Sequence, residues 1–98
     1  LSAYPFIKFD LSFSVPIEFQ ASDLTNYIES ILIENENNIS IFDNFTNEKT
    51  RNLGIRIITR SYEKTYTETE SSEILEMIVK KVESKFKLKL NKREENAT

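Results

Sequence analysis

Residues 9–19 read FDLSFSVPIEF, and apolar and polar side chains alternate through the whole stretch. A period of two sustained over eleven residues predicts a long β-strand with one face on a core and the other face polar. Pro16 has no N–H to donate, so we expect the strand to be unpaired there on its N–H side or to carry a bulge. The apolar face would consist of Phe9, Leu11, Phe13, Val15, Ile17 and Phe19.

Two amphipathic segments predict helices that could cover this apolar face. The first spans residues 23–34, with Ser22 or Asp23 as its N-cap and apolar side chains three and four residues apart. The second spans residues 70–85, with acidic residues at its start and lysines at its end, as the helix dipole favours. Its apolar ridge consists of Ile74, Ile78, Val82 and Phe86.

A β-hairpin is predicted between the two helices. Residues 39–45 are apolar at alternate positions, with a shift of phase at Phe42. Residues 46–52 are polar and typical of a turn, and a second β-rich run extends through residues 55–66. Gly54, the single glycine of the chain, would supply a positive φ or a bulge.

The end of the chain predicts a short strand followed by a polar tail. Residues 86–90 alternate apolar residues with lysines, which predicts a strand whose exposed side discourages edge pairing. Residues 91–98 are almost entirely polar, and we expect them to fray. The predicted order is therefore β-α-β-β-α-β, a single α+β domain over residues 5–90. Its architecture would be a two-layer sandwich, in which two helices cover one face of an antiparallel sheet.

The composition argues against most kinds of catalytic or metal site. The 98 residues include no Cys, no His and no Trp, which excludes Ser-His and Cys-His dyads and the usual zinc sites. We therefore expect no enzyme activity, no cofactor and no metal. No segment approaches the ~20 apolar residues that a membrane span needs. One oxygen-rich segment is predicted to be a hydrated turn rather than a Ca²⁺ site, and it consists of Asp43, Asn44, Asn47 and Glu48.

Basic and aromatic residues alternate along the second strand of the predicted hairpin. If this strand continued to residue 66, one face of the sheet would interleave cations with rings, a pattern that can stack bases and neutralise phosphates. The alternative is a solvated face with ordinary cross-strand pairs, which the net charge of −3 favours. The candidate face consists of Arg56, Arg60, Tyr62, Lys64 and Tyr66.

A second basic cluster lies at the end of the second predicted helix and in the strand after it. These side chains could dock on an acidic partner or on an anionic lipid surface. Alternatively, they serve helix stability and solubility, as lysines at a helix C-terminus and on an edge strand commonly do. The candidate docking patch consists of Lys81, Lys85, Lys87 and Lys89.

The predicted fold is ferredoxin-like or SEA-like, and two families share more than the element order. SEA modules of cell-surface proteins have a Gly-Ser-Val cleavage turn before their third strand, where this chain reads Leu53-Gly54-Ile55-Arg56. The nucleophilic Ser is missing, so self-cleavage is not expected. The stretch Val15-Pro16-Ile17-Glu18-Phe19 resembles the strand end of the small dimerising subunit of the KEOPS tRNA-modification complex. Each resemblance covers only a few residues.

These patterns leave three functions open. The first is a non-catalytic protein-interaction module that assembles with a protein partner or a second copy through a sheet edge or the outer sheet face. Long one-sided strands and seven Phe residues, a generous number for a small core, favour it. The second is a nucleic-acid-associated accessory subunit, similar to the KEOPS subunit, and the third is an SEA-like extracellular domain. In each case we expect the chain to be part of a larger chain or complex.

Overall fold

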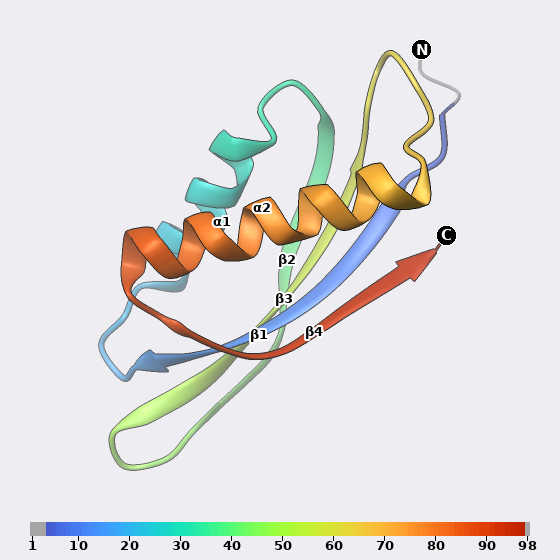
Figure 1. Ribbon diagram of the computed structural model, residues 1–98. Coiled ribbons are helices and arrows are strands. Elements are labelled where there is room, and N and C mark those ends of the chain that lie inside the picture. The colour runs from blue at the N-terminus through green and yellow to red at the C-terminus, as the bar shows by residue number, and fades with distance from the viewer. Residues whose placement is uncertain (1–3, 98) are drawn as a thin grey trace.

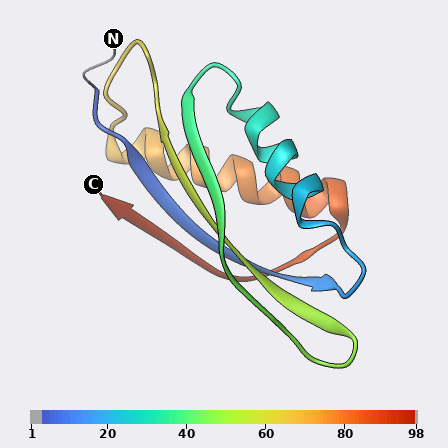
Figure 2. The same ribbon diagram turned by 180° about the vertical axis from the view of Figure 1, so that it is seen from behind.

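The computed structural model describes residues 4–97, and the side chains of all these residues except 43–45 and 96–97. Four strands form one antiparallel sheet in the order β2-β3-β1-β4, and α1 and α2 both lie on one face of it (Figures 1 and 2). This confirms the predicted two-layer α+β sandwich. In chain order the elements are β1 (Ile7–Pro16), α1 (Ala21–Ile31), β2 (Glu36–Thr46), β3 (Thr50–Arg60), α2 (Glu68–Phe86) and β4 (Lys89–Ala97).

Strand β1 supplies the centre of the core. Its inner side chains, Phe9, Leu11, Phe13 and Val15, are all at most 1% exposed, as the alternation predicts. The strand ends at Pro16, however, because the Phe19 N–H donates to the Pro16 carbonyl at 3.0 Å and turns the chain toward α1. Residue 17 therefore lies in the turn, and its side chain is 43% exposed rather than on the strand's core face.

The two helices cover the inner face with the sides that the sequence predicts. Leu24 and Ile28 of α1 are fully buried, as are Ile78 and Val82 of α2. The predicted N-caps of α1 are wrong, because α1 begins at residue 21 and is capped by Gln20 without a side-chain hydrogen bond. Ser22 and Asp23 thus fall within the first turn, where the Asp23 carboxylate still favours the positive end of the helix dipole.

Helix α2 is closed at both ends by local interactions. The Thr67 hydroxyl accepts from the Glu70 N–H and the Glu70 carboxylate accepts from the Thr67 N–H, which forms a capping box. At the other end Lys87 adopts a left-handed conformation with φ 58°, and its N–H donates to the Glu83 carbonyl at 2.9 Å. The second end turns the chain directly into β4. Within the described residues, neither helix is both long and apolar enough to cross a membrane.

The β2–β3 hairpin is longer than predicted at its start and shorter at its end. Strand β2 begins at residue 36, and β3 stops at Arg60 rather than near residue 66. Gly54 has no positive φ, but the pairing shifts opposite it: Ile41 faces Ile55 and residue 43 faces Gly54. Phe42 is therefore the extra residue of a β-bulge, which explains the shift of phase seen in the sequence.

Residues 91–97 do not form the frayed tail that the sequence predicts. They continue β4 and pair with β1 as far as residue 97. Two side-chain contacts also join this segment to α2, from Arg93 to Glu76 at 2.8 Å and from the Ser72 hydroxyl to Glu95 at 3.1 Å. The prediction failed because a strand made of polar residues has no apolar alternation, whereas backbone pairing to a neighbouring strand needs none.

Candidate functional site

The face of the sheet that the helices leave uncovered has a floor of small side chains. Residues directly opposite in an antiparallel pair share a face, and here Ser12 faces Gly54 while Ser14 faces Asn52. Ser12 and Ser14 alternate with the buried positions of β1, so the face that they share with their partners in β3 is the outer face, which is turned toward the viewer in Figure 2. Gly54 itself is buried.

A hydrogen bond crosses this floor and joins β4 to β3, two strands that are not neighbours in the sheet. The side-chain amide of Asn91 in β4 donates to Asn52 Oδ1 in β3 at 2.7 Å. Strand β1 lies between them, and its serines leave room for the bridge. Asn91 is available because it is the extra residue of a second bulge, where Ser12 faces Lys92 and Phe13 faces Leu90.

An exposed aromatic ring borders the floor on the β2 side. Phe42, the bulged residue of β2, is 49% exposed, and the Arg56 guanidinium carbon lies 5.1 Å from its ring centroid. Arg56 is itself fixed, because its Nε and Nη2 donate to the two carboxylate oxygens of Asp10 at 2.9 and 3.1 Å. Hydrogen bonding to Asp10 raises the pKa of Arg56 further above its usual value. The ring is therefore supported by a guanidinium that is already paired.

Two lysines border the floor on the β4 side. Lys89 faces Ser14 and Lys92 faces Ser12 across the β1–β4 pair, so both side chains lie on the outer face. Neither takes part in an ion pair among the described residues. We call this whole region the outer sheet surface, and it consists of Ser12, Ser14, Phe42, Asn52, Gly54, Lys89, Asn91 and Lys92.

The structure divides the predicted basic and aromatic face into two parts. Arg56 and Arg60 lie on the outer face of β3, but Tyr62, Lys64 and Tyr66 belong to the loop before α2. The prediction of one continuous strand face is therefore wrong. The strand face stops at Arg60 because β2 begins at residue 36, directly opposite Arg60. Beyond Arg60, β3 therefore has no residue of β2 to pair with.

Four of these five side chains are engaged within the chain. Arg60 donates to Glu36 at 2.8 and 3.0 Å, and its guanidinium carbon lies 4.3 Å from the Phe6 ring centroid. Arg56 pairs with Asp10, Lys64 binds Glu70, and the Tyr66 hydroxyl accepts from the Asn35 amide at 2.9 Å. Tyr62 is 56% exposed. These contacts tie the loop and the sheet together.

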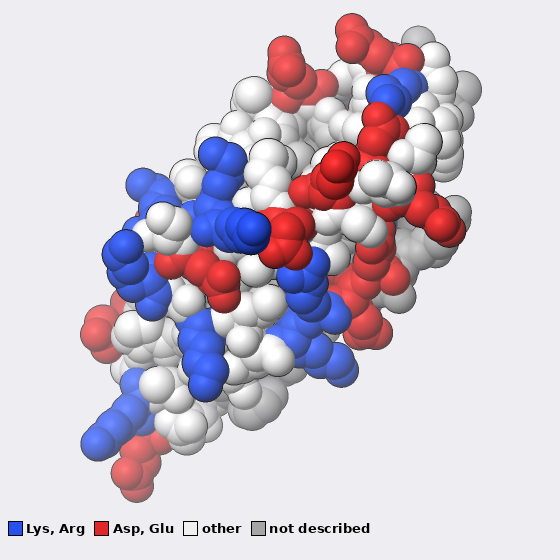
Figure 3. Space-filling model, in the orientation of Figure 1, with Lys and Arg blue, Asp and Glu red and all other residues white. Residues whose placement is uncertain are grey.

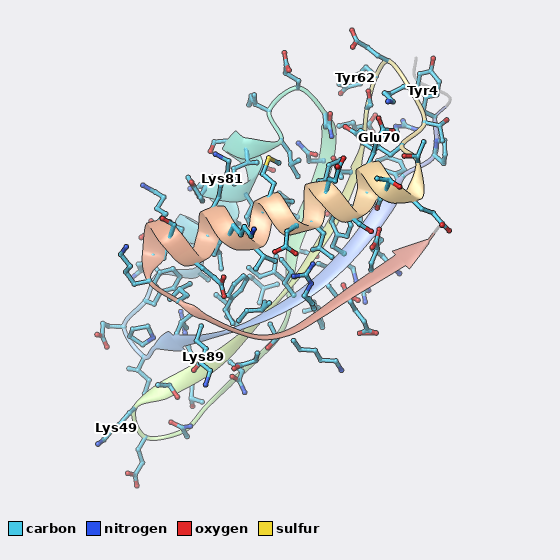
Figure 4. All side chains as sticks on the ribbon, in the orientation of Figure 1. Tyr4, Lys49, Tyr62, Glu70, Lys81 and Lys89 are labelled. Atoms are coloured by element: carbon cyan, nitrogen blue, oxygen red, sulfur yellow. The ribbon has the colours of Figure 1, made fainter. Side chains whose placement is uncertain are left out.

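The predicted lysine patch spans the end of α2 and the start of β4. Lys81 and Lys85 lie one helical turn apart, Lys87 is the C-cap, and Lys89 begins β4. Figure 3 shows the basic side chains gathered over this half of the molecule, and Figure 4 places Lys81 and Lys89 on the two sides of the turn. None of the four lysines has an ion-pair partner among the described residues.

An open hollow of about 460 Å³ lies beside this patch, between the two helices. Phe86 packs edge-to-face on Tyr27, with ring centroids 5.5 Å apart, and the Lys85 ammonium lies 5.2 Å from the Tyr27 centroid. The cation is therefore held over rings rather than by a carboxylate. The hollow is lined by Asp23, Asn26, Tyr27, Lys85 and Phe86.

Hydrogen bonds between the Asn47 side chain and the backbone stabilise the oxygen-rich turn. The Asn47 Oδ1 atom accepts from the N–H groups of Lys49 and Thr50 at 3.0 Å, which closes the hairpin as an Asx turn. The side chains of Asp43 and Asn44 lie outside the described residues. Among the side chains that are described, no three His, Cys, Asp or Glu residues come together to hold a metal ion.

Sequence reasoning missed most of the outer sheet surface. Phe42, Asn52 and Asn91 were not candidates, because isolated polar and aromatic residues in different strands show no spacing that links them. One signal was present: the shift of phase at Phe42 marks the bulge that turns this ring outward. Lys89 was a candidate for a different reason, as part of the lysine patch.

Comparison with known proteins gives two matches. Residues 2–91 match the family described as the ferredoxin-fold anticodon binding domain. The phenylalanine–tRNA ligase beta subunit of Carboxydothermus hydrogenoformans is 32% identical over 94 residues. This alignment covers 92% of the chain but 12% of that protein, so the chain spans about an eighth of the length of this relative.

Proposed function

The chain belongs to the ferredoxin-fold anticodon-binding domain family, and from this premise we propose that it binds the anticodon loop of a transfer RNA on the outer sheet surface. Proteins read RNA sequence mainly in single-stranded loops, whose bases can be splayed out, stacked on rings and hydrogen-bonded at their edges. An anticodon loop offers such bases. This surface offers a ring for stacking and amides for base edges, and it adds lysines that can bind the phosphates of the loop.

Each part of the outer sheet surface has a role in this proposal. Phe42 stacks on an unpaired base, since it is exposed and its ring is held in place by Arg56. Asn52 and Asn91 offer amide groups to base edges. Lys89 and Lys92 bind phosphates, because no carboxylate among the described residues competes for them. Arg56 and Arg60 act as supports, since both are paired.

The observation that carries the proposal is that ring, amides and unpaired cations meet on one side of the sheet. The other side of the sheet is covered by α1 and α2 and buries its side chains. The predicted basic and aromatic face is less suitable, because its cations are already satisfied by Asp10, Glu36 and Glu70. Single-strand binding combines stacking rings with unpaired cations.

Titration with an anticodon stem-loop RNA tests this function. Phe42→Ala is expected to weaken binding about 5- to 150-fold, because stacking of a base on a ring contributes roughly 1–3 kcal/mol. The double variant K89Q/K92Q is expected to reduce the slope of log affinity against log salt by about 1.4, because each phosphate that a lysine neutralises adds roughly 0.7 to that slope.

Lys64→Gln serves as the control, because it removes a cation that is bound to Glu70 in the loop before α2. It is expected to leave both the affinity and the salt slope unchanged. If the wild-type chain does not bind the RNA at low salt, or if Phe42→Ala binds as the wild type does, the outer sheet surface is not an anticodon site.

The relative suggests the setting in which such a domain works. It is named as the beta subunit of a phenylalanine–tRNA ligase, and the chain corresponds to an eighth of its length. In this proposal, the chain is the RNA-binding module of a phenylalanine–tRNA ligase. The residues that form the bond to the tRNA lie in other parts of that enzyme. Binding should then be stronger for a phenylalanine-specific anticodon stem-loop than for one with a scrambled anticodon.

A contrast between the two sheet edges favours a second function, assembly with another copy of the chain. The β4 edge carries Lys89, Lys92, Arg93, Glu94 and Glu95, and charge discourages strand pairing. The β2 edge has no charged residue from 37 to 42, and Ile41 beside the bulge is 37% exposed. We propose that two β2 edges pair in antiparallel fashion.

Sedimentation velocity across a concentration series tests this assembly. The wild type should move from monomer toward dimer as concentration rises. Ser40→Lys places a charge in the middle of the edge and should abolish the shift, whereas Ser84→Lys on the exposed side of α2 should not. A wild-type chain that stays monomeric throughout the series would rule the assembly out.

A further inference from the structure

One segment of the chain concentrates positive charge in an otherwise acidic protein. Residues 80–93 contain seven basic residues and one acidic residue, a net charge of +6. The whole chain carries −3, so the remaining residues carry −9. A local field of this sign attracts polyanions although the net charge is negative.

Eight of the 13 basic side chains fall into two groups, according to whether a carboxylate pairs with them. Arg56, Arg60, Lys64 and Arg93 each have a carboxylate oxygen within 3.0 Å or less. The four lysines of the patch have no carboxylate partner in the part of the chain that the structure describes, and all four are exposed. The charges of Lys81, Lys87 and Lys89 are therefore available to a ligand, and the Lys85 ammonium lies 5.2 Å from the Tyr27 ring centroid without a carboxylate partner. We call Lys81, Lys85, Lys87 and Lys89 the lysine track.

The fold joins the lysine track to the outer sheet surface. Lys89 belongs to both, since it faces Ser14 on the outer face. Lys87 and Lys89 flank the buried Leu88, so the left-handed turn at Lys87 carries the track from the sheet to α2. Lys85 and Lys81 continue it along the helix at a spacing of one turn. Figure 4 shows Lys89 on the strand side and Lys81 on the helix side of this turn.

The chemistry of the track suits phosphates rather than bases. Lysines are point charges that neutralise phosphates without reading sequence. The described part of the track presents no exposed ring of its own, since Phe86 is packed between Phe19 and Tyr27. Double-stranded RNA presents mainly its sugar–phosphate backbone to proteins, because its deep major groove is closed to side chains.

We infer that the lysine track binds the phosphate backbone of the RNA stem next to the loop held by the outer sheet surface. This inference rests on the proposed function and specifies its ligand: the substrate is an RNA hairpin whose stem contributes binding, not merely a single-stranded anticodon. The stem runs from the sheet around the turn at Lys87 and along the end of α2. The acidic residues of the first half of α2 mark the limit of the contact.

Two hairpins with the same loop test the inference. In one the stem is natural RNA, and in the other the stem linkages are uncharged methylphosphonates. The wild-type chain should bind the charged stem about tenfold more tightly at low salt, with a salt slope steeper by about 2 to 3, as three phosphate contacts imply. The triple variant K81Q/K85Q/K87Q should bind the two hairpins equally well.

A charge-matched variant separates a local effect from a change in net charge. K8Q/K49Q/K64Q also removes three positive charges, but from other parts of the molecule. It should keep the difference in affinity between the two hairpins. Phe42→Ala should weaken binding of both hairpins by the same factor, since it acts on the loop. Circular dichroism should show that each variant is folded.

Several results would overturn the inference. If the wild type binds both hairpins equally well, the stem makes no contact, although the outer sheet surface can still be an anticodon site. If the wild type binds neither hairpin, the proposed function fails as well. If the track variants lose binding only to phosphatidylserine vesicles and keep the difference between the hairpins, the track is a lipid-binding surface instead.

Discussion

At the scale of single residues, pairing with carboxylates decides which cations of this protein are available to a ligand. Two arginines of β3 have planar guanidinium groups that donate twice to one carboxyl group, Arg56 to Asp10 and Arg60 to Glu36. Each pair joins two neighbouring strands and holds a nearby ring, Phe42 or Phe6. The arginines thus shape the outer face, whereas lysines at its border are left to bind anions.

Glu70 gives a prediction about pH. Hydrogen bonds from Lys64 and from the Thr67 N–H lower the pKa of Glu70 below its usual value of 4.5. A pKa that is lower in the folded state stabilises the fold above the usual value, and this contribution is lost as the pH falls through the lowered value. We expect the melting temperature of Glu70→Gln to fall less than that of the wild type between about pH 6 and about pH 3.

Thermal unfolding followed by circular dichroism measures this difference. Glu68→Gln is the matched control, since it removes a carboxylate from the same helical turn but leaves the capping box intact. It should keep the pH dependence that Glu70 contributes. An equal loss of melting temperature in the wild type and in Glu70→Gln over this pH range would mean that the carboxylate adds nothing to the fold in solution.

At the scale of single elements, β4 depends on pairing rather than on burial. Leu88 just before the strand and Leu90 at its start pack on the core, but residues 91–95 are all exposed. The strand is kept in place by its ladder to β1 and by the contacts of Arg93 and Glu95 with α2. It also places Asn91 and Lys92 at the candidate site.

A chain that ends after Leu90 tests this view of β4. Its free energy of unfolding in urea should be lower by on the order of 3 kcal/mol, because several ladder hydrogen bonds of about 0.5–1.5 kcal/mol each are removed against regained backbone entropy. RNA binding should weaken as well, because Asn91 and Lys92 are gone. A chain that lacks only residue 98 is the control and should behave as the wild type.

An unchanged urea midpoint after removal of residues 91–98 would instead support the frayed tail that composition predicts. Amide hydrogen exchange offers an independent measurement on the full chain. Protection that extends through residues 92–95 indicates a paired strand, and exchange at the rate of a free peptide indicates a frayed one.

At the scale of the whole molecule, the fold places the helices on one face of the sheet and separates acidic from basic side chains along α2. The helices occupy one side of the sheet and leave the other for a ligand (Figures 1 and 2). Along α2, carboxylates lie toward one end and unpaired lysines toward the other (Figure 3). In the proposed function, this acidic chain presents a basic surface to RNA, and the rest of its charge repels RNA from other parts of the molecule.

The order of elements and the core were predictable because their signals are local. Alternation in β1, the amphipathic spacing of α1 and α2, and the hairpin all describe neighbours in sequence, and each element is present in the structure. The basic and aromatic face failed as a prediction because its extent depended on where β2 begins, which is a property of another strand. The polar part of β4 failed for the same reason.

By itself, the sequence determined most of the side chains that enter the core, with Ile17 as an exception, and it excluded catalytic sites that need His or Cys, because periodicity and composition need no knowledge of distant partners. Only the tertiary structure decided the candidate site. Register brings Ser12 beside both Gly54 and Lys92, and two bulges turn Phe42 and Asn91 to the outer face. The ion pairs then determine which cations are left for a ligand. All three depend on strands that meet from distant parts of the chain, and the shift of phase at Phe42 is the one local sign of them in the sequence.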